Sequence, residues 1–308
     1  MARGELRRIR REVEGQPEAL KHFSRSKMPK ASEGSIFVGA GDSYAAALAG
    51  FYASKGGCIG IDPYTVATVP EITKGRDVFF ISVSGRTLSN LLAARRVRRL
   101  AKKTTALTAV PESELAALTD QIVALPMTYV PKTPGMLSFS LSLLAVLKMT
   151  MVDISCDFER AFESAQSDRK NISFGRGTTY FLGNSMAYPV ALYTAAKTYE
   201  FLGTKAHAEL LEEFSHLELF SLKKSDSVNL FGCFDPAGIS KKLARALTAR
   251  GYVSRQIAAR GKSDSERIFH SVFASQLAVL DRAEDAGLTE PKFLSTGDKL
   301  DISDAMIY

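Results

Sequence analysis

Short apolar runs alternate along the chain with stretches whose apolar residues recur at helical spacing. In the first half, the runs that predict strands are SIFVG (35–39), CIGID (58–62), DVFFISV (77–83), TTALTAV (104–110) and QIVALPM (121–127). The segments between them, such as DSYAAALAGFYASK and TLSNLLAARRVRRLAKK, have the periodicity of helices, and GMLSFSLSLLAVLKMTM follows as a long, mostly buried helix. Strands that alternate with helices predict a parallel sheet covered by helices on both faces.

The same order of elements returns in the second half. TTYFLG (178–183), DSVNLFGCF (226–234) and YVSRQIA predict strands, and YFLGNSMAYPVAL repeats the strand, glycine, serine and helix of FVGAGDSYAAAL. An offset of about 140 to 150 residues between the copies indicates a duplicated α/β unit. We therefore expect an N-terminal subdomain in residues 1–152, which includes an N-terminal helix, a helical linker in 153–171, and a C-terminal subdomain with a tail in 172–308.

Hydroxyl side chains gather where two strands of the first half end. Ser43 opens the helix after the first strand, and SVSGRT after the third strand adds Ser82, Ser84 and Thr87. Gly85 in this loop lets a ligand approach the backbone closely. Parallel sheets bind ligands beyond the carboxyl ends of their strands, where helix N-termini attract anions. The hydroxyls either cap helices or donate to a phosphate, and their clustering favours phosphate.

A nucleotide site is the less favoured interpretation of these loops. The pattern GxxxxGK[ST] is absent, and of GxGxxG only Gly39 and Gly41 match, because Tyr44 stands at the third glycine position. A dinucleotide enzyme would also need an acidic ribose partner after the second strand, for which Asp62 is the candidate.

Composition and charge narrow the function without deciding it. The net charge of +7 is concentrated in RRIRR and in RRVRRLAKK (95–103), which form either a solvated helix face or a polyanion groove; the first is favoured because no nucleic-acid-binding motif accompanies them. Cys58, Cys156 and Cys233 form no CxxC pair and no HExxH is present, so we expect neither a disulfide framework nor a metal site. No apolar run reaches the roughly 18 residues of a membrane span, and the basic N-terminal stretch lacks the apolar core of a signal peptide. We expect a cytoplasmic protein.

At these motifs the chain resembles the sugar isomerase (SIS) domain family, in particular the isomerase domain of glucosamine-6-phosphate synthase and its stand-alone deaminase relatives. GDSYAAAL resembles the family's GTSYNSG turn and SVSGRT its SxSGET phosphate loop. LGNSMAYPVALYTAAKTYE is similar to LGRGxxYPxALEGALKLKE, and EEFSH to GELKHGP. The resemblance runs in order through both copies and implies two tandem subdomains of the flavodoxin-like, three-layer α/β/α type.

The resemblance also implies a site for a phosphorylated sugar. The residues on the family's phosphate binders are Ser43, Ser82, Ser84 and Thr87, and further candidates for substrate contact are Gly41, Gly85, Arg86 and Lys197. Glu200 falls on the general base that moves a proton between C1 and C2, and His216 on the histidine that opens the sugar ring from the neighbouring subunit. One base that serves both carbons suits an aldose–ketose conversion, and histidine titrates near neutral pH.

Several positions depart from the family pattern. Arg86 replaces an acidic residue of the phosphate loop, and SHLE replaces the KHGP turn. The family's tail lysine, which forms an imine with a keto sugar, has no counterpart at the matching place, and Lys299 is the nearest candidate by position only. The absence of this lysine weakens the case for amino transfer more than the case for plain isomerisation.

We expect a homodimeric enzyme with a site shared between subunits, without a metal or nucleotide cofactor. Its substrate would be a hexose or hexosamine 6-phosphate, as in the conversion of glucosamine 6-phosphate to fructose 6-phosphate. Because the chain begins with MARGEL rather than a nucleophilic cysteine, we expect no built-in ammonia source. The alternative is a non-catalytic SIS protein that binds a phosphosugar and regulates a partner, which the altered EEFSHLE and tail motifs support. Neither nucleic acid nor membrane is an expected partner.

Overall fold

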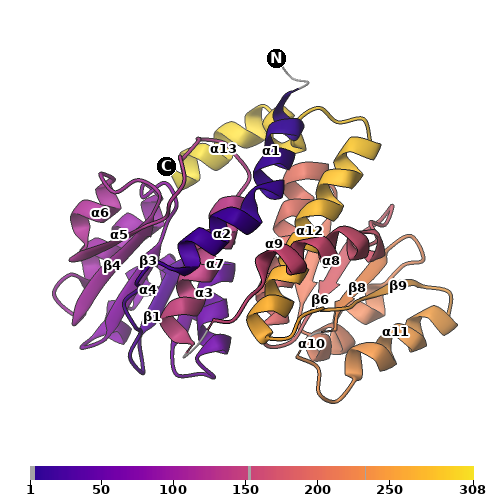
Figure 1. The fold of residues 1–308 in the computed structure, drawn as a ribbon, viewed down its shortest axis with the longest axis horizontal. Coiled ribbons are helices and arrows are strands. Elements are labelled where there is room, and N and C mark those ends of the chain that lie inside the picture. The colour runs from indigo at the N-terminus through magenta and orange to yellow at the C-terminus, as the bar shows by residue number, and fades with distance from the viewer. Residues whose placement is uncertain (1–3, 152–153, 233) are drawn as a thin grey trace. The chain divides into compact units, whose positions relative to one another are not determined.

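The computed structural model describes residues 4–151, 154–232 and 234–308, which pack as two compact units (Figure 1). The β1–β5 unit comprises His22–Ile154 and Thr296–Tyr308, and the β6–β9 unit comprises the residues up to Lys21 together with Ser155–Ser295. Each unit contains one parallel sheet with its own helices. The predicted fold class, two α/β subdomains built on parallel sheets, is confirmed.

The sheet of the β1–β5 unit has the strand order β2-β1-β3-β4-β5, and every neighbouring pair is parallel. Its strands are β1 (Ile36–Gly39), β2 (Ile59–Ile61), β3 (Asp77–Ile81), β4 (Lys103–Thr108) and β5 (Gln121–Ala124). Its helices are α3 (Asp42–Ala53), α4 (Pro63–Thr68), η2 (Pro70–Thr73), α5 (Leu88–Val97), α6 (Glu114–Leu118), α7 (Leu137–Thr150) and α13 (Asp298–Ile307). The sequence boundary between the units lies within α2 (Gln16–Ser24).

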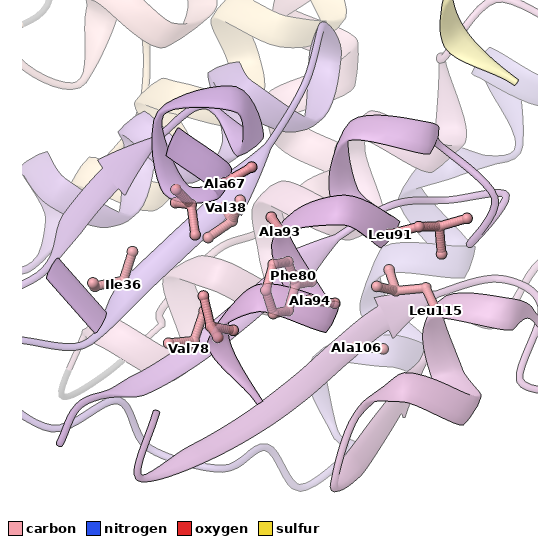
Figure 2. Packing of buried hydrophobic residues seen from close by; sticks show 12 residues of the cluster. Ile36, Val38, Ala67, Val78, Phe80, Leu91, Ala93, Ala94, Ala106 and Leu115 are labelled. Atoms are coloured by element: carbon pink, nitrogen blue, oxygen red, sulfur yellow. The ribbon is translucent and has the colours of Figure 1, made fainter. Parts of the chain in front are cut away.

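Both faces of this sheet are covered, because alternate strand residues point to opposite sides. One face forms a buried cluster with α4, α5 and α6, and Figure 2 shows among its members Ile36, Val38, Val78, Phe80, Leu91 and Leu115. On the other face, Phe37 packs closely against Gly50 of α3. A Cβ added at Gly50 would lie 2.9 Å from the Phe37 ring. Burial on two sides explains why the strands read as nearly continuous apolar runs.

The sheet of the β6–β9 unit has the order β7-β6-β8-β9 and is also fully parallel. Its strands are β6 (Thr179–Leu182), β7 (Ala206–Glu209), β8 (Ser227–Phe231) and β9 (Val253–Ile257). Its helices are α1 (Glu5–Glu14), α8 (Phe158–Asp168), η3 (Arg169–Asn171), α9 (Ala187–Leu202), α10 (Leu211–His216), η4 (Glu218–Ser221), α11 (Ile239–Ala249), α12 (Asp264–Asp285) and η5 (Lys292–Ser295). One buried cluster joins β6 and β8 to α10 and α11, while α12 packs against α8 and α9.

One strand escapes prediction from the sequence. The strand β7 reads AHAE, in which only Ala206 and Ala208 are buried while His207 is exposed. A short edge strand of this kind lacks the β-branched and aromatic residues by which strands are recognised. Pairing with β6 defines this strand instead: Ala206 is the partner of Thr179, and Glu209 is the partner of Leu182.

Packing divides the chain differently from the expected subdomain boundaries in three places. Helix α1 packs with α12, where Arg10 donates to Asp281 and Glu284 at 2.8 Å, so it belongs to the β6–β9 unit. Helix α8, within the expected linker, packs against α12 in the same unit. The tail helix α13 instead contacts α5 of the β1–β5 unit. The expected boundary at 152 and 153 lies outside the described residues.

The cysteines and the long helices add two observations. Cys58 and Cys156 are free thiols in the described part of the chain, and Cys233 lies outside it. Among the described residues, no helix combines the length and the apolar character needed to cross a membrane.

Candidate functional site

The strand register brings the two hydroxyl-bearing loops of the β1–β5 unit together. β1 and β3 are neighbours, and their last residues, Gly39 and Ile81, are partners in the register. The turn with Ser43 and the loop with Ser82 therefore leave the sheet side by side at its carboxyl edge. Helices α3 and α5 begin directly after these loops. The helix dipoles place a partial positive charge at these two N-termini, which favours an anion at this edge. In α3 the N–H groups of Ser43, Tyr44 and Ala45 already donate to backbone carbonyls of the preceding turn.

Two hydroxyls of the SVSGRT loop, those of Ser82 and Thr87, contact each other rather than cap the following helix. Ser82 Oγ lies 3.1 Å from Thr87 Oγ1. Thr87 occupies the N-cap position of α5, but its side chain makes no capping hydrogen bond. Ser82 and Ser84 are buried, with exposed fractions of 3% and 4%, and Thr87 is half-buried. The interpretation of these hydroxyls as simple helix caps therefore does not hold for Thr87.

Gly85 fixes the shape of the loop. Its φ of +62° lies in the left-handed region, and an added Cβ would lie 2.0 Å from Ser113 Oγ. The carbonyl of Gly85 accepts a hydrogen bond of 3.0 Å from the N–H of Leu115, and Arg86 N–H donates to Ser84 Oγ at 3.3 Å. Only glycine meets both the conformation and the close packing here, so the loop is held rigidly against the segment before α6.

The remaining candidates of this unit lie around the loops with different exposure. Ser43 is half-buried in the first turn of α3, and Gly41, with a φ of +56°, is exposed before it with open space around its Cα. The side chain of Arg86 is exposed. The loop thus combines buried hydroxyls with an exposed cation, and both kinds of group can bind an anion.

Asp62, the candidate ribose partner, serves a structural role. It is the N-cap of α4, and its Oδ1 accepts from Thr65 N–H at 2.9 Å. Burial opposes ionisation, but the hydrogen bonds from Thr65 outweigh it and lower the pKa of Asp62. Its carboxylate is already committed to the helix terminus, so nothing at this position favours a dinucleotide.

Two tyrosines beside the loop were not predicted as site residues. The phenol of Tyr308, at the end of α13, interacts with the side chains of Ser84 and Tyr129. Tyr308 is 54% exposed, and the burial of the rest of its side chain raises its pKa, to which the neighbouring Tyr129 adds. No local motif surrounds either tyrosine, and they lie far from SVSGRT in the sequence, so only the folded chain identifies them.

In the β6–β9 unit, Glu200 is paired with a buried lysine. Lys197 Nζ lies 2.5 Å from Glu200 Oε2, one helical turn away on α9. The Lys197 side chain is 0% exposed and its ammonium also lies 5.4 Å from the centre of the Tyr193 ring, whereas Glu200 is 31% exposed. The carboxylate of Glu200 therefore lies at the surface, and the buried ammonium of Lys197 compensates its charge.

His216 ends α10 and is open to solvent. Its side chain is 69% exposed, and its Nε2 lies 3.2 Å from Glu212 Oε1 on the same helix. Two large apolar side chains follow it, Leu217 at 60% and Phe220 at 84% exposed. The structure thus places Glu200 and His216 in one unit and the hydroxyl loops in the other.

One group of potential metal ligands occurs among the described residues. His207, Glu209 and Glu218 bring a donor atom each within 4.8 Å of one another. His207 Nε2 lies 2.9 Å from Glu218 Oε1 and 3.6 Å from Glu209 Oε2, as in an ordinary surface ion pair. His207 is 46% exposed, so these contacts need no ion to account for them.

Comparisons with known proteins agree with this architecture. Residues 31–152 match the SIS domain family. The structure resembles glucosamine-6-phosphate deaminase from Thermotoga maritima, with a TM-score of 0.72 and 22% identity over 90% of this chain and 94% of that one. It also resembles the C-terminal domain of glucosamine-fructose-6-phosphate aminotransferase from Francisella tularensis, with a TM-score of 0.67 and 17% identity over 90% and 95% of the two chains.

A further similar structure is tagatose-6-phosphate ketose/aldose isomerase from Escherichia coli, with a TM-score of 0.70 and 17% identity over 91% of this chain and 93% of that one. No curated protein matches the sequence. At these identities the likeness to solved structures establishes the fold.

Proposed function

We propose that the protein is a phosphosugar isomerase or an aminosugar-phosphate deaminase that acts on a hexose or hexosamine 6-phosphate, a proposal that the match of residues 31–152 to the SIS domain family supports. The observation that carries this proposal is the contact between Ser82 and Thr87 at the carboxyl edge of the sheet, in which Thr87 leaves its helix uncapped. Hydroxyls that do not cap a helix are available to a ligand.

A phosphate ester fits this loop in charge and in hydrogen bonding. A phosphate offers acceptor oxygens only, and Ser43, Ser82, Ser84 and Thr87 each carry one hydroxyl donor. The dipoles of α3 and α5, whose N-termini lie at these loops, also favour negative charge. Arg86 would approach the phosphate from the exposed side. The sugar would then extend away from the loop.

We assign the proton transfer to Glu200, on the resemblance of TAAKTYE to the family's base motif. A single carboxylate can take a proton from C1 or C2 and return it to the other carbon. The ion pair with Lys197 supports this assignment, because a fixed ammonium holds the carboxylate ionised and in one orientation. Lys197, being fully buried, would act as a positioning residue in the free protein.

Ring opening is assigned to His216 acting on the site of a second copy of the chain. The high exposure of His216 supports this role, since a histidine that serves a neighbouring subunit must project from its own. Leu217 and Phe220 supply exposed apolar surface beside it, which would be buried on dimerisation. The proposed enzyme is accordingly a homodimer.

The second candidate function is a regulatory protein that binds a phosphosugar without converting it. The SHLE sequence at His216 favours it, because the turn that follows the family's histidine is absent here. This protein would use the same phosphate loop, and Glu200 would have no role in binding.

A panel of hexose and hexosamine 6-phosphates, assayed for ketose and for ammonia, distinguishes the two functions. The proposed enzyme converts at least one of them, and Glu200→Gln lowers turnover by about 100- to 10,000-fold while binding changes little. Glu163→Gln, at an exposed glutamate of α8, is the matched control and retains activity. Binding without any product supports the regulatory protein, and full activity of Glu200→Gln removes Glu200 from the mechanism.

A further inference from the structure

Three side chains of the β6–β9 unit converge at one edge of its sheet. His207 and Glu209 are two residues apart on β7, the edge strand, so their side chains leave the strand on the same face. Glu218, the first residue of η4, meets them there: His207 Nε2 lies 2.9 Å from Oε1 of Glu218 and 3.6 Å from Oε2 of Glu209. The group therefore joins the edge strand to the segment that follows α10.

The spacing of these three donors is close to that of ligands around one divalent ion. Imidazole nitrogen and carboxylate oxygen bind Zn²⁺ at about 2.0 to 2.2 Å, so two of them in a tetrahedral shell lie about 3.3 to 3.6 Å apart. The distances of 2.9 and 3.6 Å from the imidazole nitrogen lie near this range, and the three residues bring a donor atom each within 4.8 Å of one another. One imidazole and two carboxylates are also ligand types that Zn²⁺ accepts, and two carboxylate charges match that of the ion.

Two of the donors are already held in place by other contacts. The N–H of Leu210 donates to Oε1 of Glu209 at 2.8 Å, while Oε2 of the same carboxylate faces His207. The His207 ring lies edge-on to that of Tyr180, its partner in the strand register, with 6.2 Å between the ring centroids. Contacts of this kind orient metal ligands in proteins. His207 and Glu209 would therefore bind an ion with little rearrangement.

Glu218 carries an oxygen that the ion pair leaves unsatisfied. Its Oε1 faces His207, whereas its Oε2 is buried and has no hydrogen-bond partner in the part of the chain that the structure describes. An anionic oxygen withdrawn from water without a donor is costly. A cation bound to the carboxylate would offset this cost. A surface ion pair thus accounts for the contacts of His207 but not for the buried oxygen of Glu218.

We propose that His207, Glu209 and Glu218 bind a divalent transition-metal ion, with Zn²⁺ as the best match, in a structural site that ties β7 to η4. Water would complete the coordination shell, because His207 is 46% exposed. HExxH places its two histidines on a helix, whereas two of the ligands proposed here come from the strand residues HAE, so that motif does not detect this site. The inference is independent of the proposed function.

Calorimetric titration of the EDTA-treated, full-length protein with Zn²⁺ tests the site. We expect one tight site per chain. His207→Gln, Glu209→Gln and Glu218→Gln should each weaken it by about 100-fold or more, since loss of even an outer-shell partner costs about 10- to 100-fold. His22→Gln, at an exposed histidine, is the matched control and keeps the affinity of the wild type. Absence of binding, or equal affinity in the wild type and all three ligand variants, overturns the proposal.

His216 and Glu212 form a second pair of possible donors, one helical turn apart on α10. If His216→Gln removes the tight site while His207→Gln leaves it, the ion binds to that pair and the proposal is wrong. Glutamine keeps the size of glutamate, and exposed ion pairs contribute little to stability, so the metal-free Glu218→Gln protein should unfold near the wild type. Thermal unfolding of the metal-free variants thus separates the loss of a ligand from the loss of the fold.

Two further measurements locate the ion. Zn²⁺ that binds only the folded chain should raise the midpoint of thermal unfolding of the wild type and leave that of Glu218→Gln unchanged. Amide hydrogen exchange should slow in Ala206–Glu209 and in Glu218–Ser221 when Zn²⁺ is added, because the ion joins these two segments. Exchange that stays the same in both segments while Zn²⁺ is bound would place the ion elsewhere and overturn the proposal.

Discussion

The ammonium of Lys197 lies 2.5 Å from Oε2 of Glu200, and the lysine side chain is completely buried while the glutamate is not. Burial of the lysine side chain is unusual, because a buried ammonium is costly unless an opposite charge accompanies it. In this ion pair the cation is fixed in the interior and the carboxylate lies at the surface. If Glu200 is the base, its proton affinity depends on Lys197.

Replacement of Lys197 by methionine should displace the pH profile of the reaction. An adjacent cation favours the ionised carboxylate, so its removal should move the acidic limb of kcat/KM to higher pH. Lys241→Met, at an exposed lysine of α11, should leave the limb in place. A Lys197→Met enzyme with lower activity but an unmoved limb would show that the lysine only supports the helix.

Thr87→Val should separate binding from folding. The valine keeps the shape of threonine, and Thr87 makes no capping hydrogen bond, so the usual cost of losing a cap, about 1 kcal/mol, should not appear in the free energy of unfolding. The loss of a donor to a charged phosphate should weaken binding by about 10- to 100-fold. Denaturant titration and calorimetry measure the two effects, and a destabilised variant with normal affinity would show that Thr87 serves the fold, through its contact with Ser82, and not the ligand.

Gly85→Ala should damage the phosphate loop beyond the cost of its backbone conformation. A Cβ at position 85 would overlap Ser113, and the left-handed φ adds strain of about 1–2 kcal/mol. Gly75→Ala in the same unit is the matched control, because it has a φ of +71° and nothing within 4 Å of the added Cβ. We expect a larger loss of stability and of phosphate binding at position 85 than at position 75. Equal losses at the two positions would mean that the loop can move away from Ser113 without a cost in free energy.

His270 should make the stability of the β6–β9 unit dependent on pH. His270 is 0% exposed, and its Nε2 lies 3.1 Å from Asp168, which Arg260 also contacts at 2.5 Å. Burial lowers the pKa of His270 from its ordinary value of 6.5, although Asp168 acts against the shift. The unfolded chain therefore binds a proton at a higher pH than the folded one.

Stability should accordingly be complete above pH 6.5 and fall as the pH drops below it, with a slope of up to about 1.4 kcal/mol per pH unit. The pKa of Asp168 is lowered from 3.8, so its own contribution is lost only in stronger acid. Thermal unfolding between pH 8 and 5 should show the loss in the wild type and a flatter curve for His270→Gln. His22→Gln, at an exposed histidine, should follow the wild type; parallel curves for all three proteins would exclude His270 as the cause.

Local pattern was sufficient for the fold class and for most of the elements. The run DVFFI became β3 because its last four residues are apolar and are buried in a parallel sheet that is covered on both faces. The hydroxyls that follow the strand mark its carboxyl end. The likeness of GDSYAAAL and SVSGRT to one family was equally readable, since both motifs are local. The strand β7 was missed because its two small buried residues carry no such signal and its partner strand defines it.

Relations between distant segments needed the folded chain. That Thr87 turns to Ser82 instead of capping α5, that Lys197 is buried below Glu200, and that Tyr308 reaches Ser84 depend on side-chain directions and on packing that no residue's neighbours in the sequence specify. The same holds for the grouping of α1 with α12 and of α13 with α5. Residue type states which bonds a side chain can make, while the competition among all its neighbours in space selects the bond that forms.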